Sequence, residues 1–173
     1  YIYIHDMSAR RDTMNCCLFD VKSVLTGGFE MGNLWYNEPK TLDTAFDVIG
    51  DIVLSAASQQ YGGFTVPSVD DILEPFARKS HERLIKKYRE LGLDEETVQK
   101  VAWADLEKEM EQGFQGWEYK FNSVSSSRGD YPFITVTVGT VPSKYGKLVT
   151  MKMLEVRKKG QGKEGHRKPV LFP

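Results

Sequence analysis

The chain has 173 residues, 40% of them hydrophobic and 27% charged, which is enough for one globular domain with a hydrophobic core. Its formal net charge of -1 gives no overall field that would attract nucleic acid or a membrane surface. No apolar run approaches the roughly 18 residues that a transmembrane helix requires, and the N-terminal residues lack the pattern of a secretory leader, so a cytoplasmic protein is expected.

The first predicted element is a strand over residues 1–4, where aromatic and β-branched side chains alternate. His5 and Asp6 close this strand. A histidine beside an aspartate could orient or bind a ligand, or it could simply complete a turn. The sequence starts inside this strand and stops at Pro173 on the approach to another strand, so both ends are interpreted as cuts through a larger protein.

Cys16 and Cys17 are the only cysteines, and they lie in a predicted buried strand that continues to about Val24. Adjacent cysteines do not form an easy disulfide with each other, and they do not provide the usual spaced metal ligands. Strand neighbours point to opposite faces, so one thiol could face a cleft as a redox group. Alternatively, both cysteines are small apolar fillers, because free cysteine is often buried. Two unspaced cysteines also favour the cytoplasm.

Four helices are predicted from apolar periodicity and from residues that favour helix N-termini. The expected N-caps are Thr41, Ser68, Asp94 and Ser143. The predicted helices cover residues 41–60, 69–91, 94–114 and 143–156. The first helix has an apolar stripe wide enough to pack against its own sheet and against a second subunit.

Turns, loops and one further strand are expected between these helices. Gly27 and Gly28 predict a turn, because glycine readily adopts positive φ. Residues 31–40 and 64–67 are expected to be loops. Ile134–Val138 alternates β-branched residues with threonines and is expected to be a strand.

Three polar regions could contact a ligand. Residues 113–133 run from a dense aromatic stretch into a serine cluster that ends at Arg128, and such groups suit phosphates or sugar hydroxyls. A serine-rich surface turn is the alternative. The basic face of the helix over 69–91 and the basic, glycine-bearing segment 158–168 could also contact phosphates. Solvated surface is the simpler interpretation of both, and no Gly-x-x-x-x-Gly-Lys-Ser/Thr pattern is present.

Several motifs follow one another in a distinctive order. They are His5-Asp6, Asn15-Cys16-Cys17, Gln60-Tyr61-Gly62-Gly63, Gly113-Phe114-Gln115-Gly116 and the run from Asn122 to Phe133. As an ordered set that covers nearly the whole chain, they resemble the anaerobic (class III) ribonucleoside-triphosphate reductases. The resemblance implies a helix-rich α/β fold. Residues 1–173 would form one partial domain, the N-terminal half of the ten-stranded α/β barrel of glycyl-radical enzymes and ribonucleotide reductases.

The resemblance also implies partners and cofactors. The complete enzyme is expected to be a cytoplasmic homodimer that reduces ribonucleoside triphosphates and binds deoxynucleoside triphosphate effectors near helices at the dimer interface. By the same resemblance, a radical-SAM activase with an iron–sulfur cluster installs a glycyl radical, formate is the reductant, and four cysteines hold a structural zinc. The radical glycine, the thiyl cysteine and the zinc ligands cannot be placed in this sequence. We therefore expect no metal or cofactor within the chain, and no turnover without the rest of the polypeptide.

The resemblance assigns the catalytic role to Cys16, which matches the first cysteine of the family motif. Its sulfur would lie beside formate, on the face of the ribose from which water leaves, and Cys17 would point into the wall. His5 and Asn15 are expected to hold ribose hydroxyls. The residues expected to line the nucleotide cleft are Asn122, Ser125, Ser126 and Arg128.

Two other functions remain open. The chain could be a non-catalytic scaffold fragment that only dimerises or binds nucleotide. It could also be a thiol-based redox protein, although disulfide oxidoreductases favour a Cys-x-x-Cys spacing that is missing here.

Overall fold

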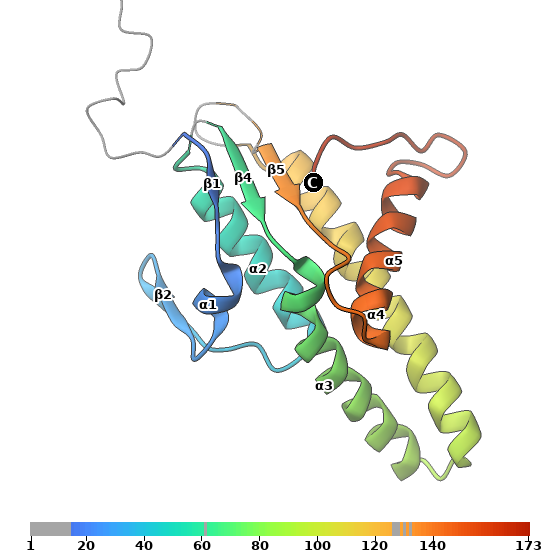
Figure 1. Cartoon of the computed structure of the whole chain (residues 1–173). Helices are drawn as coiled ribbons and strands as arrows, with labels where there is room; N and C mark the ends of the chain where they lie inside the picture. Colours follow the sequence, from blue (N-terminus) through green and yellow to red (C-terminus); the bar gives the residue numbers. More distant parts are fainter. Residues whose placement is uncertain (1–14, 61, 126–128, 130, 132) are drawn as a thin grey trace, which may run out of the picture.

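The computed structural model describes residues 15–60, 62–125, 129, 131 and 133–173 (Figure 1). The described elements, in chain order, are β1 (Cys17–Leu18), α1 (Val21–Leu25), β2 (Phe29–Met31), β3 (Leu34–Tyr36), α2 (Leu42–Ala57), β4 (Gly63–Val66), α3 (Val69–Glu90), α4 (Glu95–Ser123), β5 (Phe133–Val136) and α5 (Lys144–Lys159). They form a helix-rich α/β structure with a parallel sheet, as predicted. The strand expected over residues 1–4, together with His5 and Asp6, lies outside the described residues.

Strand β4 lies at the centre of a three-stranded parallel sheet, with β1 on one side and β5 on the other. Cys17 is opposite Phe64 in the first pair, and Gly63 is opposite Phe133 in the second. Parallel neighbours require long crossover connections, which α2 and the α3–α4 pair provide. Because the three strands run in one direction, the segments that lead into them meet at one edge of the sheet.

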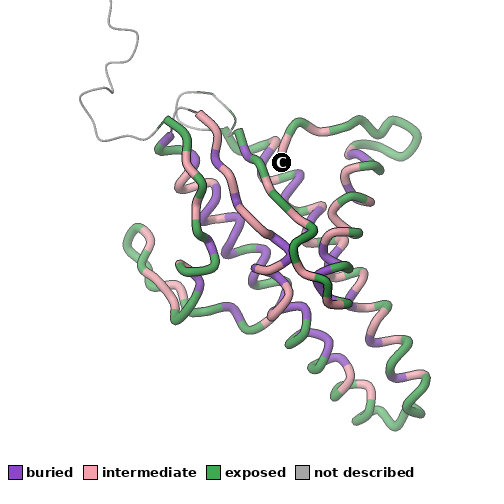
Figure 2. The backbone as a smooth tube through the Cα atoms, in the orientation of Figure 1, coloured by how far each residue is buried: buried purple, intermediate pink, exposed green. Residues whose placement is uncertain are grey.

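One face of the sheet packs against helices, and the other face is exposed in the part of the chain that the structure describes. Helices α2 and α4 lie behind the sheet in Figure 1, and Phe64, Val66 and Ile134 point into the core with at most 3% of their surface exposed. Leu18 and Phe133, on the opposite face, are 69% and 60% exposed. The two-residue period of a strand produces this alternation. Figure 2 shows the resulting exposed positions along β1 and β5.

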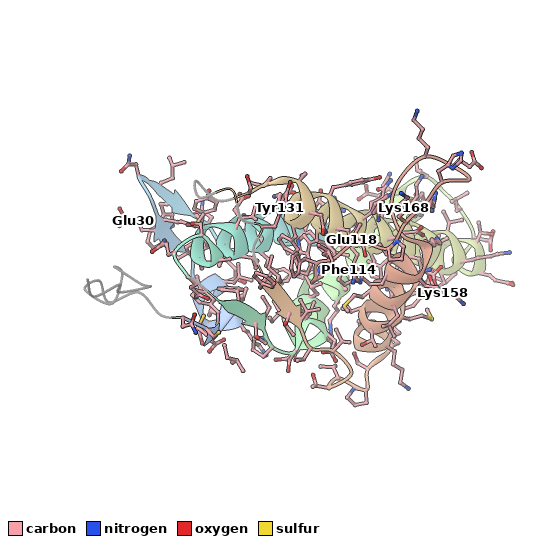
Figure 3. All side chains as sticks on the ribbon, turned by 90° about the horizontal axis from the view of Figure 1, so that it is seen from above. Glu30, Phe114, Glu118, Tyr131, Lys158 and Lys168 are labelled. Atoms are coloured by element: carbon pink, nitrogen blue, oxygen red, sulfur yellow. The ribbon has the colours of Figure 1, made fainter. Side chains whose placement is uncertain are left out.

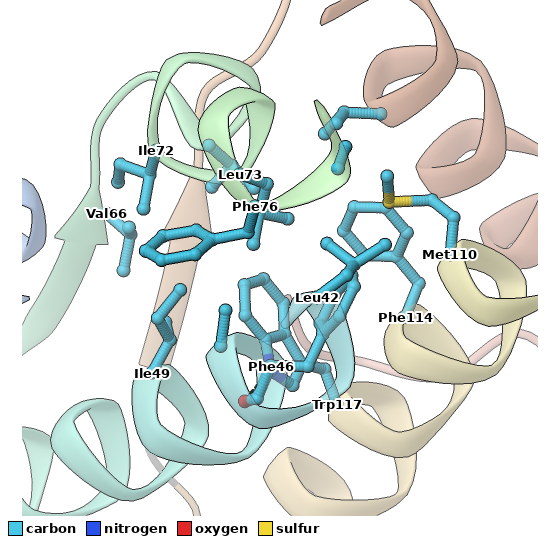
Figure 4. Packing of buried hydrophobic residues seen from close by; sticks show 14 of the residues in the cluster. Leu42, Phe46, Ile49, Val66, Ile72, Leu73, Phe76, Met110, Phe114 and Trp117 are labelled. Atoms are coloured by element: carbon cyan, nitrogen blue, oxygen red, sulfur yellow. Dashed lines mark hydrogen bonds between the residues drawn. The ribbon is translucent and has the colours of Figure 1, made fainter. Parts of the chain in front are cut away.

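The aromatic contact between α2 and α4 lies at the centre of the core (Figure 4). The ring of Phe46 meets the rings of Phe114 and Trp117 edge-on, at centroid distances of 5.0 and 4.9 Å. The indole N–H of Trp117 donates to the backbone carbonyl of Phe46 at 2.8 Å. Edge-on packing suits the charge distribution of aromatic rings and adds to the gain from burial. Gly113 permits this close approach, because a methyl group at its position would overlap the ring of Phe46.

A buried aspartate fixes the loop between β5 and α5. Asp70, in the first turn of α3, is fully buried. Its carboxylate accepts the backbone N–H groups of Thr140 at 2.7 Å and Val141 at 2.6 Å. These bonds compensate for the loss of water around the carboxylate, so the start of α3 and the approach to α5 are joined.

His81 joins the three long helices. It is 3% exposed on α3, and its Nδ1 lies 2.9 Å from the hydroxyl of Tyr145 on α5. Its ring also meets Trp103 of α4 edge-on at 5.3 Å. Burial lowers the pKa of His81, and the nearby cation of Lys144 lowers it further. The imidazole is therefore held in its neutral form.

Capping and periodicity predicted most of the helices correctly. Helices α2, α3 and α5 and strand β5 lie within a few residues of the predicted spans. Helix α4 is an exception, because it continues to Ser123 instead of ending near Phe114. Trp117 and Phe121 extend the buried stripe and hold the helix together past Gly113 and Gly116. Within the described part of the chain, no helix has both the length and the apolar character needed to cross a membrane.

The prediction of the short strands was partly wrong. The strand that contains Cys17 has two residues and does not reach Val24, because the side chain of Asp20 accepts the N–H of Ser23 at 3.1 Å and begins α1. Most of a β2–β3 hairpin lies in residues 31–40, which were expected to be a loop. Residues 64–67 were also expected to be a loop, but most of them belong to β4, the central strand. Each of these strands is too short for an alternation of apolar and polar side chains to be recognised in the sequence.

Gly113 and Gly116 provide a test of the α2–α4 contact. Alanine favours a helix over glycine by about 0.5–1 kcal/mol, so Gly116→Ala, which meets open space, should raise the free energy of unfolding by up to that amount. Gly113→Ala should lower the free energy of unfolding by about 1–3 kcal/mol, because the added methyl group overlaps Phe46. Urea denaturation of both variants measures the difference. Equal changes in the free energy of unfolding would show that Gly113 and Phe46 pack less closely than described.

His81 should make the stability depend on pH near neutrality. Its folded pKa lies below the ordinary value of 6.5, so the unfolded chain takes up a proton first as the pH falls. The free energy of unfolding should therefore be highest above pH 6.5 and fall below it, and His81→Phe should flatten this dependence. The pKa of Glu95 is lowered to about 2, chiefly by its hydrogen bond to Arg89, so the control Glu95→Gln should alter the pH dependence of stability only below about pH 4.5. A His81→Phe variant with an unchanged pH profile would contradict the assignment.

Candidate functional site

The candidate site lies at the edge of the sheet where the three parallel strands begin. Asn15 and Cys16 lead into β1, Gly62 leads into β4, and the segment after α4 leads into β5 at Phe133. Two of the motifs identified from the sequence, around Cys16 and around Gly62, are therefore brought into direct contact. Strand β5 also begins at this edge, with Phe133 opposite Gly63.

The two cysteines have different surroundings. Cys16 is exposed, and its Sγ accepts the backbone N–H of Gly63 at 3.2 Å. Cys17 is half-buried against the core, and its Sγ accepts the side-chain amide N–H of Gln60 at 2.7 Å. An exposed thiol with a hydrogen-bond donor beside it can react with a bound molecule, whereas Cys17 packs against the hydrophobic core. The interpretation of Cys16 as a buried filler is not supported.

Asn15 is exposed beside Cys16. Its backbone carbonyl accepts the N–H of Gly62 at 2.6 Å, which fixes the main chain just before β1. This bond continues the strand pairing toward the edge of the sheet. The position of Asn15 is compatible with contact to a ligand near the Cys16 sulfur.

Asn122 has hydrogen-bond partners within the chain. Its side-chain N–H groups donate to the carbonyls of Glu118 at 2.7 Å and Phe172 at 2.6 Å. Its side-chain oxygen accepts the N–H groups of Leu171 and Phe172, both at 3.1 Å. The ring of Phe172 packs against Phe133 at the start of β5, at 5.3 Å. In this arrangement Asn122 fixes the C-terminal segment beside the site.

The remaining predicted nucleotide ligands are described only in part. Ser125 is exposed just after the end of α4. His5, Ser126 and Arg128 lie outside the described residues. The structure places Asn15 and Cys16 against Gly62 and Gly63, and the roles assigned to all of the site residues stay predictions.

A buried charged group beside Asn122 was not expected from the sequence. Glu118, which is labelled in Figure 3, is 2% exposed. Its carboxylate accepts the side-chain N–H of Gln161 at 2.5 Å and lies 3.6 Å from the guanidinium of Arg157. Gln115 also donates to Gln161 at 3.3 Å. The spacing of Gln115, Glu118 and Asn122 along one face of α4 is the only sequence signal for this group, and the predicted end of the helix near Phe114 concealed it.

A hollow lies between α2 and α4, apart from the candidate site. It has a volume of about 220 Å³ and is lined by Asp43, Phe46, Asp47, Glu109, Gln112, Gly113, Gly116, Trp117 and Lys120. Burial raises the pKa of Glu109, and the hydroxyl of Thr41 lowers the pKa of Asp43. An acidic lining repels phosphates, so this hollow is not assigned to a nucleotide. Among the residues that the structure describes, no three His, Cys, Asp or Glu side chains are placed to hold a metal ion.

The sequence matches one family model along its whole length. The model is that of the anaerobic ribonucleoside-triphosphate reductase, and it matches residues 1–173. The reductase of this name from Enterobacteria phage T4 is 32% identical over 166 residues, which are 95% of this chain and 27% of the relative. The one from Haemophilus influenzae is 35% identical over 174 aligned residues, which are 99% of this chain and 24% of the relative. The chain thus spans about a quarter of the length of the curated relatives that it matches.

A solved structure has a similar fold. It is the crystal structure of the anaerobic ribonucleotide reductase from Thermotoga maritima in complex with dATP and CTP. The TM-score is 0.59 at 17% sequence identity, and the match covers 88% of this chain and 25% of that one. At this identity, the likeness shows a common fold.

Asn122→Ala should release the C-terminal segment, because Leu171 and Phe172 lose their side-chain partner on α4. We expect a loss of about 1 kcal/mol in the free energy of unfolding and faster hydrogen exchange at the two backbone amides. The control Ser123→Ala removes only an exposed hydroxyl that bonds within α4, at 2.6 Å to the carbonyl of Tyr119. It should leave exchange at Leu171 and Phe172 unchanged. Equal exchange in both variants would mean that Asn122 does not hold this segment.

Proposed function

Because the chain belongs to the anaerobic ribonucleoside-triphosphate reductase family, we propose that it forms the cysteine-bearing, N-terminal part of the catalytic barrel of such an enzyme. The parallel order β1-β4-β5, with helices on one face, is compatible with part of a ten-stranded α/β barrel whose remaining strands lie elsewhere in the polypeptide. The uncovered face, with Leu18 and Phe133, would then face the interior of the barrel. The proposed location is the cytoplasm.

The position of the Cys16 sulfur is the observation that best supports this proposal. The sulfur is exposed at the start of β1, and its neighbour Gly63 belongs to the central strand. A thiol carried by a sheet edge is fixed by the strand pairing and still open to a substrate. Such fixed geometry is what a reaction between a protein group and a bound molecule requires.

The proposed reaction replaces the 2′ hydroxyl of a ribonucleoside triphosphate by hydrogen. The hydroxyl leaves as water, and formate supplies two electrons and is oxidised to carbon dioxide. Cys16 would lie on the side of the ribose from which water leaves and would donate its thiol hydrogen there, and the hydrogen of formate would restore the thiol as carbon dioxide forms. The glycyl radical of the complete enzyme would supply the thiyl that starts the reaction, and the isolated chain is proposed to be inactive.

The ribose and the phosphates need polar partners near Cys16. Asn15 is the candidate that lies beside the sulfur, and Ser125 is exposed just after the end of α4. The proposal also retains His5, Ser126 and Arg128 as nucleotide ligands. A role for Asn122 in binding would require it to exchange its bonds to Phe172 for bonds to the nucleotide.

The family membership suggests further partners, which belong to the same proposal. They are deoxynucleoside triphosphate effectors, a radical-SAM activase, a structural zinc held by other parts of the polypeptide, and a second copy of the enzyme. Helix α2 buries its apolar stripe against α3, α4 and β4 in the single chain, so a dimer would use its remaining surface.

Replacing Cys16 by alanine in the complete enzyme tests its role. Cys16→Ala should abolish formation of deoxynucleotides and leave the yield of glycyl radical unchanged, because the radical is loaded elsewhere. Product assays with labelled nucleotide and electron paramagnetic resonance measure the two quantities.

The control is Cys17→Ala, which changes the half-buried neighbour and should retain most of the turnover. Full product yield from Cys16→Ala would refute the assignment. Loss of product in Cys17→Ala alone would show that the two cysteines have the opposite roles.

A further inference from the structure

The segment that leads into β4 holds each residue of the Asn-Cys-Cys motif. Asn15, Cys16 and Cys17 each accept one hydrogen bond from it. The donors are Gln60, Gly62 and Gly63, which together are called the cradle below. Two of them donate to sulfur atoms and one to a backbone carbonyl. The cradle therefore fixes both the path of the main chain and the directions of the two thiols.

Within the cradle, Gly62 is in the closest contact with the motif. A methyl group at Gly62 would overlap the Sγ of Cys16. It would also lie 2.8 Å from the backbone oxygen of Asn15 and 3.0 Å from its side-chain oxygen. All three contacts are closer than the ordinary 3.4–4 Å, so a side chain fits only if the Cys16 sulfur and the Asn15 oxygens move.

The neighbouring glycine is not restricted in this way. The nearest atom to a methyl group at Gly63 is the backbone oxygen of Phe133, at 4.0 Å, which is an ordinary contact. An alanine there would keep the backbone N–H that donates to Cys16. The steric requirement for glycine is therefore specific to position 62.

We propose that Gly62 is a positioning residue for the Cys16 sulfur. Its missing side chain leaves the space that the sulfur occupies, and the N–H of Gly63 holds the sulfur there. The effect on catalysis rests on the proposed reductase function, whereas the effect on the sulfur does not. A displacement of about 1 Å in a reacting group can cost about a hundredfold in rate, so a side chain at position 62 should impair the chemical step.

The first test compares the reactivity of the two thiols in Gly62→Ala, Gly63→Ala and the native protein. Iodoacetamide labelling followed by peptide mass spectrometry gives the ratio of the Cys16 and Cys17 rates within one molecule. Gly62→Ala should change this ratio several-fold, because the added methyl group overlaps the Cys16 sulfur and Cys17 is not among the atoms nearest to it. Gly63→Ala should keep the native ratio. General loosening would raise both rates together, so an unchanged ratio in Gly62→Ala would overturn the proposal.

The second test covers the case in which Gly62→Ala folds poorly. Removing the sulfur in Gly62→Ala/Cys16→Ala removes part of the overlap. The loss in urea midpoint caused by Gly62→Ala should therefore be smaller in the Cys16→Ala background than in the native one. Equal losses in the two backgrounds would show that position 62 does not act on the sulfur.

The third test uses the complete enzyme and separates this proposal from the proposed function. Gly62→Ala should lower kcat for deoxynucleotide formation at least tenfold, with glycyl radical yield unchanged. If the thiol tests succeed but turnover is native, Gly62 still positions the sulfur, and the catalytic role of Cys16 is wrong. If the thiol tests fail, the positioning role is wrong whatever the turnover.

Discussion

The pairing of β4 with strands on both sides determines where every candidate residue lies. This strand has only four residues, yet it aligns Cys17 on one side and Phe133 on the other. Because both pairings are parallel, segments that are far apart in the sequence enter the sheet at one edge. Without this pairing, the exposed thiol of Cys16 would have neither its neighbour Gly63 nor a fixed direction.

The helices support the sheet from one side and leave the other side open. The contact of Phe46 with Trp117 joins α2 to α4, and Gly113 allows the two helices to approach. This packing provides a rigid layer behind β4, against which Cys17 is held. The strands of the site are thus supported by helices on one face and exposed on the other, which is the arrangement expected of a sheet that lines a ligand site.

The sequence predicted the helices well because capping residues and long apolar stripes are local signals. It placed both cysteines within one longer strand, but β1 begins at Cys17 and ends at Leu18, because the carboxylate of Asp20 starts a helix. Contacts between segments that are distant in the sequence could not be predicted from these local signals. Nothing local indicates that Gln60 bonds to Cys17, or that Asn122 is engaged by Phe172, because both pairs are formed by the fold. The order of the motifs indicated the family, and the structure provided the contacts between the motif residues.

The buried carboxylate of Glu118 has a mechanical consequence for the helices around it. Its partners Arg157 and Gln161 belong to α5 and to the segment that follows it. Sliding α5 along α4 by one residue would separate charges that have little water around them, and such separation is costly. Glu118 therefore opposes sliding of α5 along α4, and α4, α5 and the C-terminal segment are expected to move as one body.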